Sequence, residues 1–189
     1  MEQQVYLALL HNPVYNKNME VITTTVTNLD LHDIARASRT YDIGQYYIVN
    51  HLDSQQGLVK RMKDYWAGDF GAEYNPDRKE AFSVLEIKAE LEGVITDIMD
   101  REDKEPILVT TDARTYSNTI SYKKLRQGIQ QGEEVYLILL GTGWGLTKET
   151  MNSADYILEP IYGPGDYNHL SVRSAAAIIL DRLLGEAWW

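Results

Sequence analysis

The chain has no cysteine among its 189 residues, which excludes disulfide bonds, thiolate metal sites and cysteine nucleophiles. The four histidines are scattered without the spacing of metal ligands, so we expect no metal site. Cationic residues are also scarce, because 18 Lys and Arg stand against 28 Asp and Glu and give a formal net charge of −10. Proteins that bind nucleic acid usually carry a basic surface. Any contact with nucleic acid would therefore have to use local basic clusters.

Long apolar runs are missing as well. A run such as residues 175–180 is far too short to span a bilayer. No basic segment followed by a long apolar stretch opens the chain, so no signal peptide is expected. These absences predict a cytoplasmic protein without a membrane partner. An apolar fraction of 44% is enough for one core, and we expect residues 1–189 to form a single domain.

Short apolar segments alternate with helical patterns along the whole chain. Segments typical of buried strands lie at residues 5–10, 46–49, 83–87, 107–110, 135–140 and 156–158, with a further strand possible at 21–26. Helices are expected at residues 29–41, where Thr27 and Asp30 have capping-box form, and at 54–66, 89–99, 122–128 and 171–184. Gly71, Asn75 and Pro76 mark a loop at 68–78. The alternation predicts an α/β fold with a mainly parallel sheet and helices on both faces.

Two glycine-bearing loops follow strands in the last third of the chain. Gly141, Gly143 and Gly145 come directly after the strand at 135–140, and Gly163 follows the strand at 156–158. Glycine lets the backbone approach a ligand closely, although a tight strand-to-helix turn would explain the first loop equally well. The first loop lacks the spacing of a dinucleotide fingerprint and the Lys-Ser/Thr ending of a P-loop.

An almost wholly apolar helix follows the second loop, with Ser171 as its expected N-cap. Parallel α/β proteins bind ligands at the carboxyl ends of their strands. Two loops at strand ends in front of a buried helix therefore predict a cofactor cleft.

The order of these segments resembles the methyltransferases of the SPOUT class, the SpoU and TrmD families. The similarity lies in residues 140–146, in Glu159-Pro160-Ile161 and in residues 169–177, which together cover roughly the last third of the chain. Over nearly its whole length the chain is more similar to a less-studied SPOUT branch of RNA methyltransferases, through residues 27–36, 74–78 and 168–173. Members of that branch also occur joined or adjacent to the tRNA guanine-N1 methyltransferase.

The resemblance implies S-adenosylmethionine as cofactor, tRNA or rRNA as substrate, a deep C-terminal trefoil knot and a homodimer. A tRNA guanine-N1 methyltransferase is implied as a further partner. The knot loops would hold the cofactor largely through backbone groups. By position, the cofactor-binding residues are expected to be Thr110, Thr111, Leu140, Gly141, Gly143, Gly145, Leu146, Glu159, Ile161, His169, Leu170 and Ser171.

The same resemblance suggests catalytic residues near the first helix. In SpoU enzymes an asparagine and an arginine act there, and the arginine is proposed to activate a ribose hydroxyl. Asn28 and Arg36 are the candidates, and Asp30 has the closer spacing to Arg36. A role as a cap or turn residue explains Asn28 equally well, and a solvated position on the helix surface explains Arg36.

Two positions depart from the SpoU pattern. Gly143 stands where its glycine loop normally carries a glutamate, and Ser171 stands where its Ser-Leu-Asn segment has the asparagine. The ribose chemistry therefore does not carry over. A base nitrogen is an equal candidate for the acceptor, and an aspartate such as Asp30, or less favourably Asp166, could serve it.

Several side chains could contact RNA. Phosphate partners are available at Arg36, Arg39, Lys60, Arg61, Lys63, Arg78 and Lys79, and Tyr74 and Trp144 could stack on a base. A solvated charged face and ordinary packing explain these residues equally well. The terminal pair Trp188-Trp189 is expected to pack against the domain or a partner subunit.

Two other functions remain open from the sequence. One is a non-catalytic SPOUT module that binds cofactor or RNA and acts with a tRNA methyltransferase. The other is an unrelated α/β nucleotide binder, which the missing phosphate loop disfavours.

Overall fold

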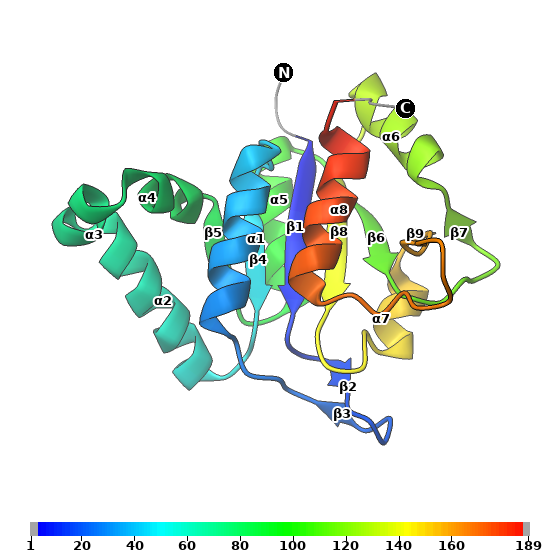
Figure 1. Cartoon of the computed structure of the whole chain (residues 1–189), viewed down its shortest axis with the longest axis horizontal. Helices are drawn as coiled ribbons and strands as arrows, with labels where there is room; N and C mark the ends of the chain where they lie inside the picture. The colour runs from blue at the N-terminus through cyan, green and yellow to red at the C-terminus, as the bar shows by residue number, and fades with distance from the viewer. Residues whose placement is uncertain (1–3, 187–189) are drawn as a thin grey trace.

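A parallel sheet of seven strands forms the centre of the molecule, in the order β5-β4-β1-β8-β6-β9-β7 (Figure 1). The computed structural model describes residues 4–186, so Trp188 and Trp189 lie outside the described residues. Adjacent strands of the sheet pair in parallel, which confirms the predicted α/β class. The strands are β1 (Val5–Leu10), β4 (Tyr46–Val49), β5 (Leu85–Lys88), β6 (Ile107–Thr111), β7 (Thr119–Ile120), β8 (Tyr136–Gly141) and β9 (Tyr156–Leu158).

Helices cover both faces of the sheet, as predicted. The helices α1 (Asn28–Thr40) and α8 (Val172–Leu184) lie side by side on one face, and α5 (Leu91–Glu102) lies behind the sheet (Figure 1). The remaining helices are α2 (Asp53–Ala67), α3 (Asp69–Tyr74), α4 (Pro76–Ser83), α6 (Tyr122–Gln131) and α7 (Lys148–Ser153). None of the helices within residues 4–186 is long and apolar enough to cross a membrane.

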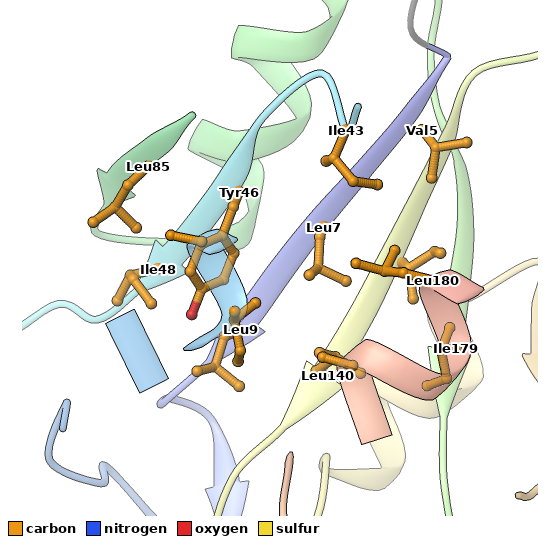
Figure 2. Packing of buried hydrophobic residues seen from close by; sticks show 14 of the residues in the cluster. Val5, Leu7, Leu9, Ile43, Tyr46, Ile48, Leu85, Leu140, Ile179 and Leu180 are labelled. Carbon is orange, nitrogen blue, oxygen red and sulfur yellow. The ribbon is translucent and has the colours of Figure 1, made fainter. Parts of the chain in front are cut away.

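The side chains of the inner strand β1 point alternately to the two sides of the sheet, and all six of its residues are buried. Leu7 and Leu9 pack in the core that faces α1 and α8, together with Leu180 (Figure 2). Ala8 and Leu10 belong to the second core, which faces α5. A strand covered on both sides needs an unbroken apolar run, and this explains why residues 5–10 carry one.

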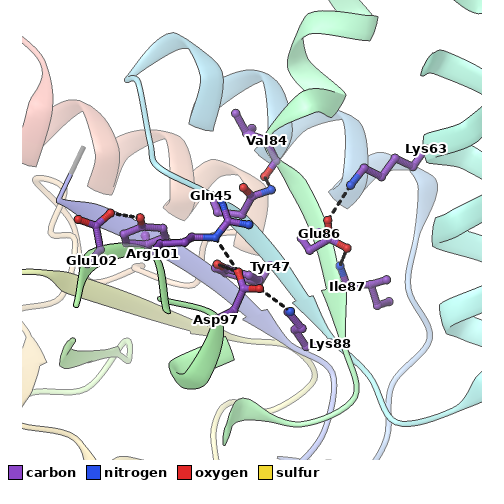
Figure 3. Close-up of polar contacts among 11 residues, drawn as sticks. Gln45, Tyr47, Lys63, Val84, Glu86, Ile87, Lys88, Asp97, Arg101 and Glu102 are labelled. Carbon is purple, nitrogen blue, oxygen red and sulfur yellow. Dashed lines mark hydrogen bonds and ion pairs between the residues drawn. The ribbon is translucent and has the colours of Figure 1, made fainter. Parts of the chain in front are cut away.

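A polar network fixes α5 against the sheet (Figure 3). The Asp97 carboxylate accepts hydrogen bonds from the Tyr47 hydroxyl at 2.6 Å, from Lys88 Nζ at 2.7 Å and from Arg101 Nε at 2.8 Å. Burial alone would raise the pKa of Asp97, but these three bonds outweigh it and lower the pKa to about 2. The neighbouring Tyr6 hydroxyl donates to Glu102.

The prediction of a loop at residues 68–78 is wrong, since these residues form α3 and most of the first turn of α4. Asn75 and Pro76 are residues typical of loops, but here they start a helix. The Asn75 side chain accepts from the backbone N–H of Arg78 as an N-cap, and Pro76 occupies the first turn, where its missing N–H costs nothing. The pattern also missed β7 and α7, which are only 2 and 6 residues long.

Between β1 and α1 the chain forms a small antiparallel hairpin, β2 (Val14–Tyr15) and β3 (Val21–Ile22). The strand predicted at 21–26 is therefore limited to residues 21–22. Thr27 then caps α1, because its hydroxyl oxygen accepts from the backbone N–H of Asp30. This capping was predicted, and it places Asp30 in the first turn of the helix.

Candidate active site

A cavity of about 900 Å³ opens where β1, β6, β8 and β9 end. This volume lies within the range of small-molecule sites, and the carboxyl edge of a parallel sheet is where α/β proteins bind ligands. Its walls come from the segment after β1, the loop after β6, the glycine loop after β8 and the segment that joins β9 to α8. Residues far apart in the chain thus meet at one edge of the sheet.

The glycine loop after β8 adopts a backbone that other residues rarely tolerate. Gly143 and Gly145 have φ values of +61° and +100°. A Cβ atom at Gly145 would meet nothing within 4 Å, so this part of the loop borders open space. A Cβ at Gly141 would lie 2.9 Å from the backbone nitrogen of Leu146. The tight turn thus explains Gly141, whereas Gly145 leaves room beside the cavity.

The hairpin is hydrogen-bonded to this glycine loop. The backbone N–H of Tyr15 donates to Gly145 O at 3.0 Å, and the N–H of Trp144 donates to Tyr15 O at 2.8 Å. A Cβ at Gly143 would lie only 2.7 Å from Tyr15 O. At the base of the hairpin, the hydroxyl oxygens of Thr24 and Thr142 are 2.5 Å apart. The hairpin and the glycine loop therefore form one wall.

The opposite wall is held by side chains from the loop after β9. One carboxylate oxygen of Glu159 accepts from the backbone N–H of Tyr122 at 2.6 Å and so holds the start of α6. The Asn168 amide donates to Ala113 O at 2.6 Å, which ties this loop to the one after β6. Ser171 caps α8 as predicted, with its hydroxyl accepting from Ser174 N–H.

The structure brings most of the predicted cofactor residues to the cavity. Two of them lie behind its wall: Thr110 is fully buried with its hydroxyl donating to Tyr156 O at 3.3 Å, and Leu146 packs in the core that faces α5. The others line the cavity, namely Thr111, Leu140, Gly141, Gly143, Gly145, Glu159, Ile161, His169, Leu170 and Ser171.

Of the three predicted catalytic residues, Asp30 is the one that lines the cavity. Its carboxylate accepts from the Thr27 hydroxyl at 2.6 Å, and the other oxygen lies 3.5 Å from Arg173 Nε. Asn28 and Arg36 are exposed and do not line it. Arg36 lies about 9 Å further along the axis of α1, at a rise of about 1.5 Å per residue.

His11 also lines the cavity, and sequence reasoning missed it. Its side chain follows β1 directly, is 1% exposed, and has Nδ1 2.9 Å from the Thr24 hydroxyl. Burial lowers the pKa of His11 to about 4, although the nearby Asp30 acts in the opposite sense, so the imidazole is neutral at pH 7. Among the described residues, nothing bonds to its buried Nε2. The sequence signal that could have identified His11 is its position directly after a buried strand.

Basic residues are scarce at the cavity. Arg114 is the one Lys or Arg among the described lining residues, and Asp112 binds it at 3.0 Å and 2.8 Å. The predicted phosphate partners do not line it, and Arg39 and Lys63 are paired with carboxylates of Asp42 and Glu86. Trp144, predicted to stack on a base, is 62% exposed and lines the cavity, whereas Tyr74 does not. Residues 4–186 contain no cluster of His, Asp and Glu that could hold a metal.

A family model described as SAM-dependent RNA methyltransferase matches residues 4–185. The chain belongs to this family. An uncharacterized protein of Aquifex aeolicus is 48% identical over 97% of this chain and 89% of its own length. A tRNA (guanine-N(1)-)-methyltransferase of Oleidesulfovibrio alaskensis is 38% identical over 98% of this chain, but the match spans only 43% of that protein. A protein of the same name from Nitratidesulfovibrio vulgaris is also 38% identical, with the same 43% covered.

Solved structures, among them that of a SpoU methyltransferase, share the fold of this chain. AviRb from Streptomyces viridochromogenes, determined in complex with AdoMet, superposes with a TM-score of 0.61 over 97% of this chain and 58% of that chain, at 14% identity. TrmJ from Z. mobilis gives a TM-score of 0.62 over 98% and 70% at 12% identity. The predicted cofactor S-adenosylmethionine and RNA methylation as the reaction are confirmed at the level of the family, and the solved structures share the fold that the SPOUT resemblance implies.

Proposed function

We propose that this methyltransferase acts on tRNA and that methyl transfer takes place in the cavity at the carboxyl edge of the sheet. The observation that carries the proposal is the cavity itself, in which the glycine loop and the first turn of α1 face one space. The names of the two 38% identical relatives support tRNA, although this chain spans less than half of each. A cytoplasmic location stays a prediction.

The residues of the glycine-loop side suit the cofactor. Leu140, Ile161 and Leu170 give apolar surface for the adenine ring, and the backbone beside Gly145 leaves open space. When bound there, S-adenosylmethionine would supply an electrophilic methyl group. The protein then has to align the acceptor with that methyl, which is the main work of the site. Thr110 and Leu146 would support this wall from behind.

The side of the cavity near α1 suits the RNA acceptor. We assign Asp30 as the group that faces the acceptor, because it is the carboxylate that the first helix delivers to the cavity. Thr27 and Arg173 hold that carboxylate in place. Asn28 and Arg36, which lie on the exposed side of the helix, would contact RNA outside the cavity rather than the reacting atoms.

The proposal includes a homodimer and the trefoil knot, both implied by the SPOUT resemblance. It also includes cooperation with a tRNA guanine-N1 methyltransferase. The support is that relatives of that name contain a region similar to this whole chain within a protein of more than twice its length. Sedimentation of the purified chain tests the dimer, and co-purification with the separate methyltransferase tests the partner.

The first experiment is a calorimetric titration with S-adenosylmethionine, with NAD and ATP as controls. Saturable binding of S-adenosylmethionine alone is expected. Transfer of labelled methyl to unmodified tRNA is then compared with transfer to rRNA. Cofactor binding without transfer to either RNA would favour a non-catalytic module, and transfer to rRNA alone would overturn tRNA as the substrate.

A further inference from the structure

The tip of the β2–β3 hairpin holds an apolar side chain on a backbone that apolar residues rarely adopt. Met19 has a φ of +63° and is 49% exposed. Its backbone N–H donates to Asn16 O at 3.0 Å, which closes a turn over residues 16–19. A turn followed by one left-handed residue forms a common three-residue hairpin loop, and glycine is favoured at the left-handed position. This chain has methionine there, so the backbone is strained.

The side chain of Asn16 fixes this strained conformation. Its Oδ1 accepts from the backbone N–H of Asn18 at 2.8 Å and from that of Glu20 at 3.0 Å, and its Nδ2 donates to the Glu20 carboxylate at 2.7 Å. The backbone N–H of Asn16 also donates to Glu20 O at 3.0 Å. Strain of this kind persists only where neighbouring contacts hold it, and it clusters at active and binding sites. The tip therefore keeps the backbone of Met19 in one conformation.

The packing of the fold does not explain an apolar residue at this position. Within residues 4–186, Met19 belongs to neither hydrophobic core. It lines the cavity instead, as does Trp144, which is 62% exposed. Both residues belong to the wall that the hairpin and the glycine loop form beyond the carboxyl ends of β1 and β8 (Figure 1). A strained methionine and an exposed tryptophan on one wall of a cavity indicate a ligand with an apolar face.

An unpaired nucleobase fits both this wall and the reaction. The chain belongs to an RNA methyltransferase family, and a nucleotide stacked inside a helix cannot enter a cavity of this kind. A base that leaves its stack exposes two apolar faces, and aromatic side chains replace the lost contacts. Methionine adapts its shape, and its thioether packs well against aromatic rings. Phosphate contacts have little part here, because Arg114 is the one described lining cation and Asp112 binds it.

We propose that Met19 and Trp144 form a clamp that holds an unpaired nucleobase of the RNA in the cavity. The base stacks on the indole of Trp144, and the Met19 side chain packs against the base from the tip of the hairpin. This inference rests on the proposed function, because it names the substrate class of the same cavity, namely RNA whose target nucleotide lies outside a helix. The clamp selects the unpaired state rather than one base, since every base has a π-face.

The first test separates the strain of Met19 from its use. Met19→Gly suits the left-handed backbone, so the melting temperature should rise by about 2–4 °C. Its affinity for unmodified tRNA should fall about fivefold, the lower end of the range for one stacked base. The matched control is Asp103→Gly, because Asp103 has a φ of +51° and does not line the cavity. It should raise the melting temperature and leave tRNA affinity unchanged.

Two further measurements decide whether the Met19 side chain contacts the RNA. Met19→Leu keeps an apolar side chain on the same backbone, so tRNA affinity should stay within about twofold of wild type. Affinity for S-adenosylmethionine should be equal in wild type and Met19→Gly, because the proposed cofactor side is formed by Leu140, Ile161 and Leu170. An equal loss of cofactor and tRNA affinity would assign Met19 to the cofactor and overturn the clamp. Unchanged tRNA affinity in Met19→Gly would also overturn it.

The second test measures RNA binding without turnover. A single-stranded RNA of about ten nucleotides is compared by fluorescence anisotropy with the duplex that it forms with its complement. Wild type should bind the single strand about tenfold more tightly, and Met19→Gly should lose most of this preference. A plot of log affinity for the single strand against log salt should have a slope no steeper than about −2, since each neutralised phosphate contributes about −0.7. Equal binding of both RNAs, or a steeper slope, would overturn the clamp.

The outcomes distinguish the clamp from the proposed function. If wild type prefers the single strand through Met19 but methylates no RNA, the proposed function fails and the clamp stands. In methyl transfer to tRNA, Met19→Gly should raise KM and change kcat little, and an unchanged KM would overturn the clamp alone. Sedimentation of wild type and Met19→Gly completes the test. A dimer that dissociates only in the variant would assign this wall to a second copy of the chain and would overturn the clamp.

Discussion

The polar cluster beneath α5 and the polar cluster at the cavity are built in opposite ways. Asp97 is bound by Tyr47, Lys88 and Arg101, so each of these groups has a partner (Figure 3). At the cavity, His11 has one nitrogen bound and the other free among the described residues. A closed network stabilises the fold, whereas an open one leaves an atom for a ligand.

His32 shows that an unpaired nitrogen alone does not mark a site. Its buried Nδ1 also has no bond within the described chain. However, the centroid of its ring lies 4.7 Å from the ring centroid of Phe82 and 5.5 Å from that of Trp66, and His32 does not line the cavity. The same chemical feature points to a ligand only where the residue that carries it lines a cavity.

The largest expected contrast between the two clusters is their response to acid. The unfolded chain protonates His11 near pH 6.5, whereas the folded chain protonates it only near 4. The free energy of unfolding therefore falls by up to about 3 kcal/mol, because of this residue, as the pH drops from 6.5 to about 4. Asp97, whose folded pKa is about 2, contributes stability that is lost only below about pH 4. Urea unfolding from pH 7 to 3 of wild type and His11→Gln should show the first loss in wild type alone.

Gly143→Ala should act on the cavity wall with the next largest effect. Its Cβ would lie 2.7 Å from Tyr15 O in a backbone with φ of +61°, so the hairpin and the glycine loop must separate. We expect affinity for S-adenosylmethionine to fall about 100-fold, or about 2.7 kcal/mol. Gly163→Ala is the control, because nothing lies within 4 Å of its Cβ. Unchanged affinity in Gly143→Ala would show that the joined wall does not shape the cofactor site.

Asp97→Asn should break the closed network without touching the cavity. It weakens three hydrogen bonds, two of them to cations, and should lower the unfolding free energy by about 2 kcal/mol. Affinity for S-adenosylmethionine should stay within about twofold, well under the 1.4 kcal/mol of a tenfold change. A loss of cofactor affinity without a loss of stability would reverse the assignment of the two clusters.

The smallest of these effects is expected for Trp144→Ala. The indole is 62% exposed, so its removal should barely alter stability. Stacking on a base is worth about 1–3 kcal/mol, and we expect tRNA affinity to fall about tenfold while cofactor affinity is kept. Filter binding of tRNA measures the change, with the exposed Tyr74, which lies outside the cavity lining, replaced by alanine for comparison.

Local signals in the sequence predicted much of the framework. The apolar run at residues 5–10 predicted the inner strand β1, and Thr27 and Ser171 were predicted as helix caps. The glycine loop was placed correctly after β8. Asn75 and Pro76 misled the prediction, because the same residue types end one helix and start the next.

The site itself was only partly predictable. The SPOUT resemblance pointed to the loops that line the cavity, but it grouped Asn28, Asp30 and Arg36 as one site. The first turn of α1 brings Asp30 inward, and the helical periodicity turns Arg36 outward. The resemblance also named Thr110 and Leu146 as cofactor-binding residues, yet their side chains pack behind the cavity wall.

What the sequence alone determined was the alternation of strands and helices, the caps and the family, because these depend on neighbouring residues and on ordered motifs. The tertiary structure decided which polar atoms were left without partners. His11, Thr24 and Thr142 are joined through hydroxyl contacts across up to 118 positions of the chain. No local pattern encodes such a contact, since it exists only when the sheet brings the ends of β1 and β8 together.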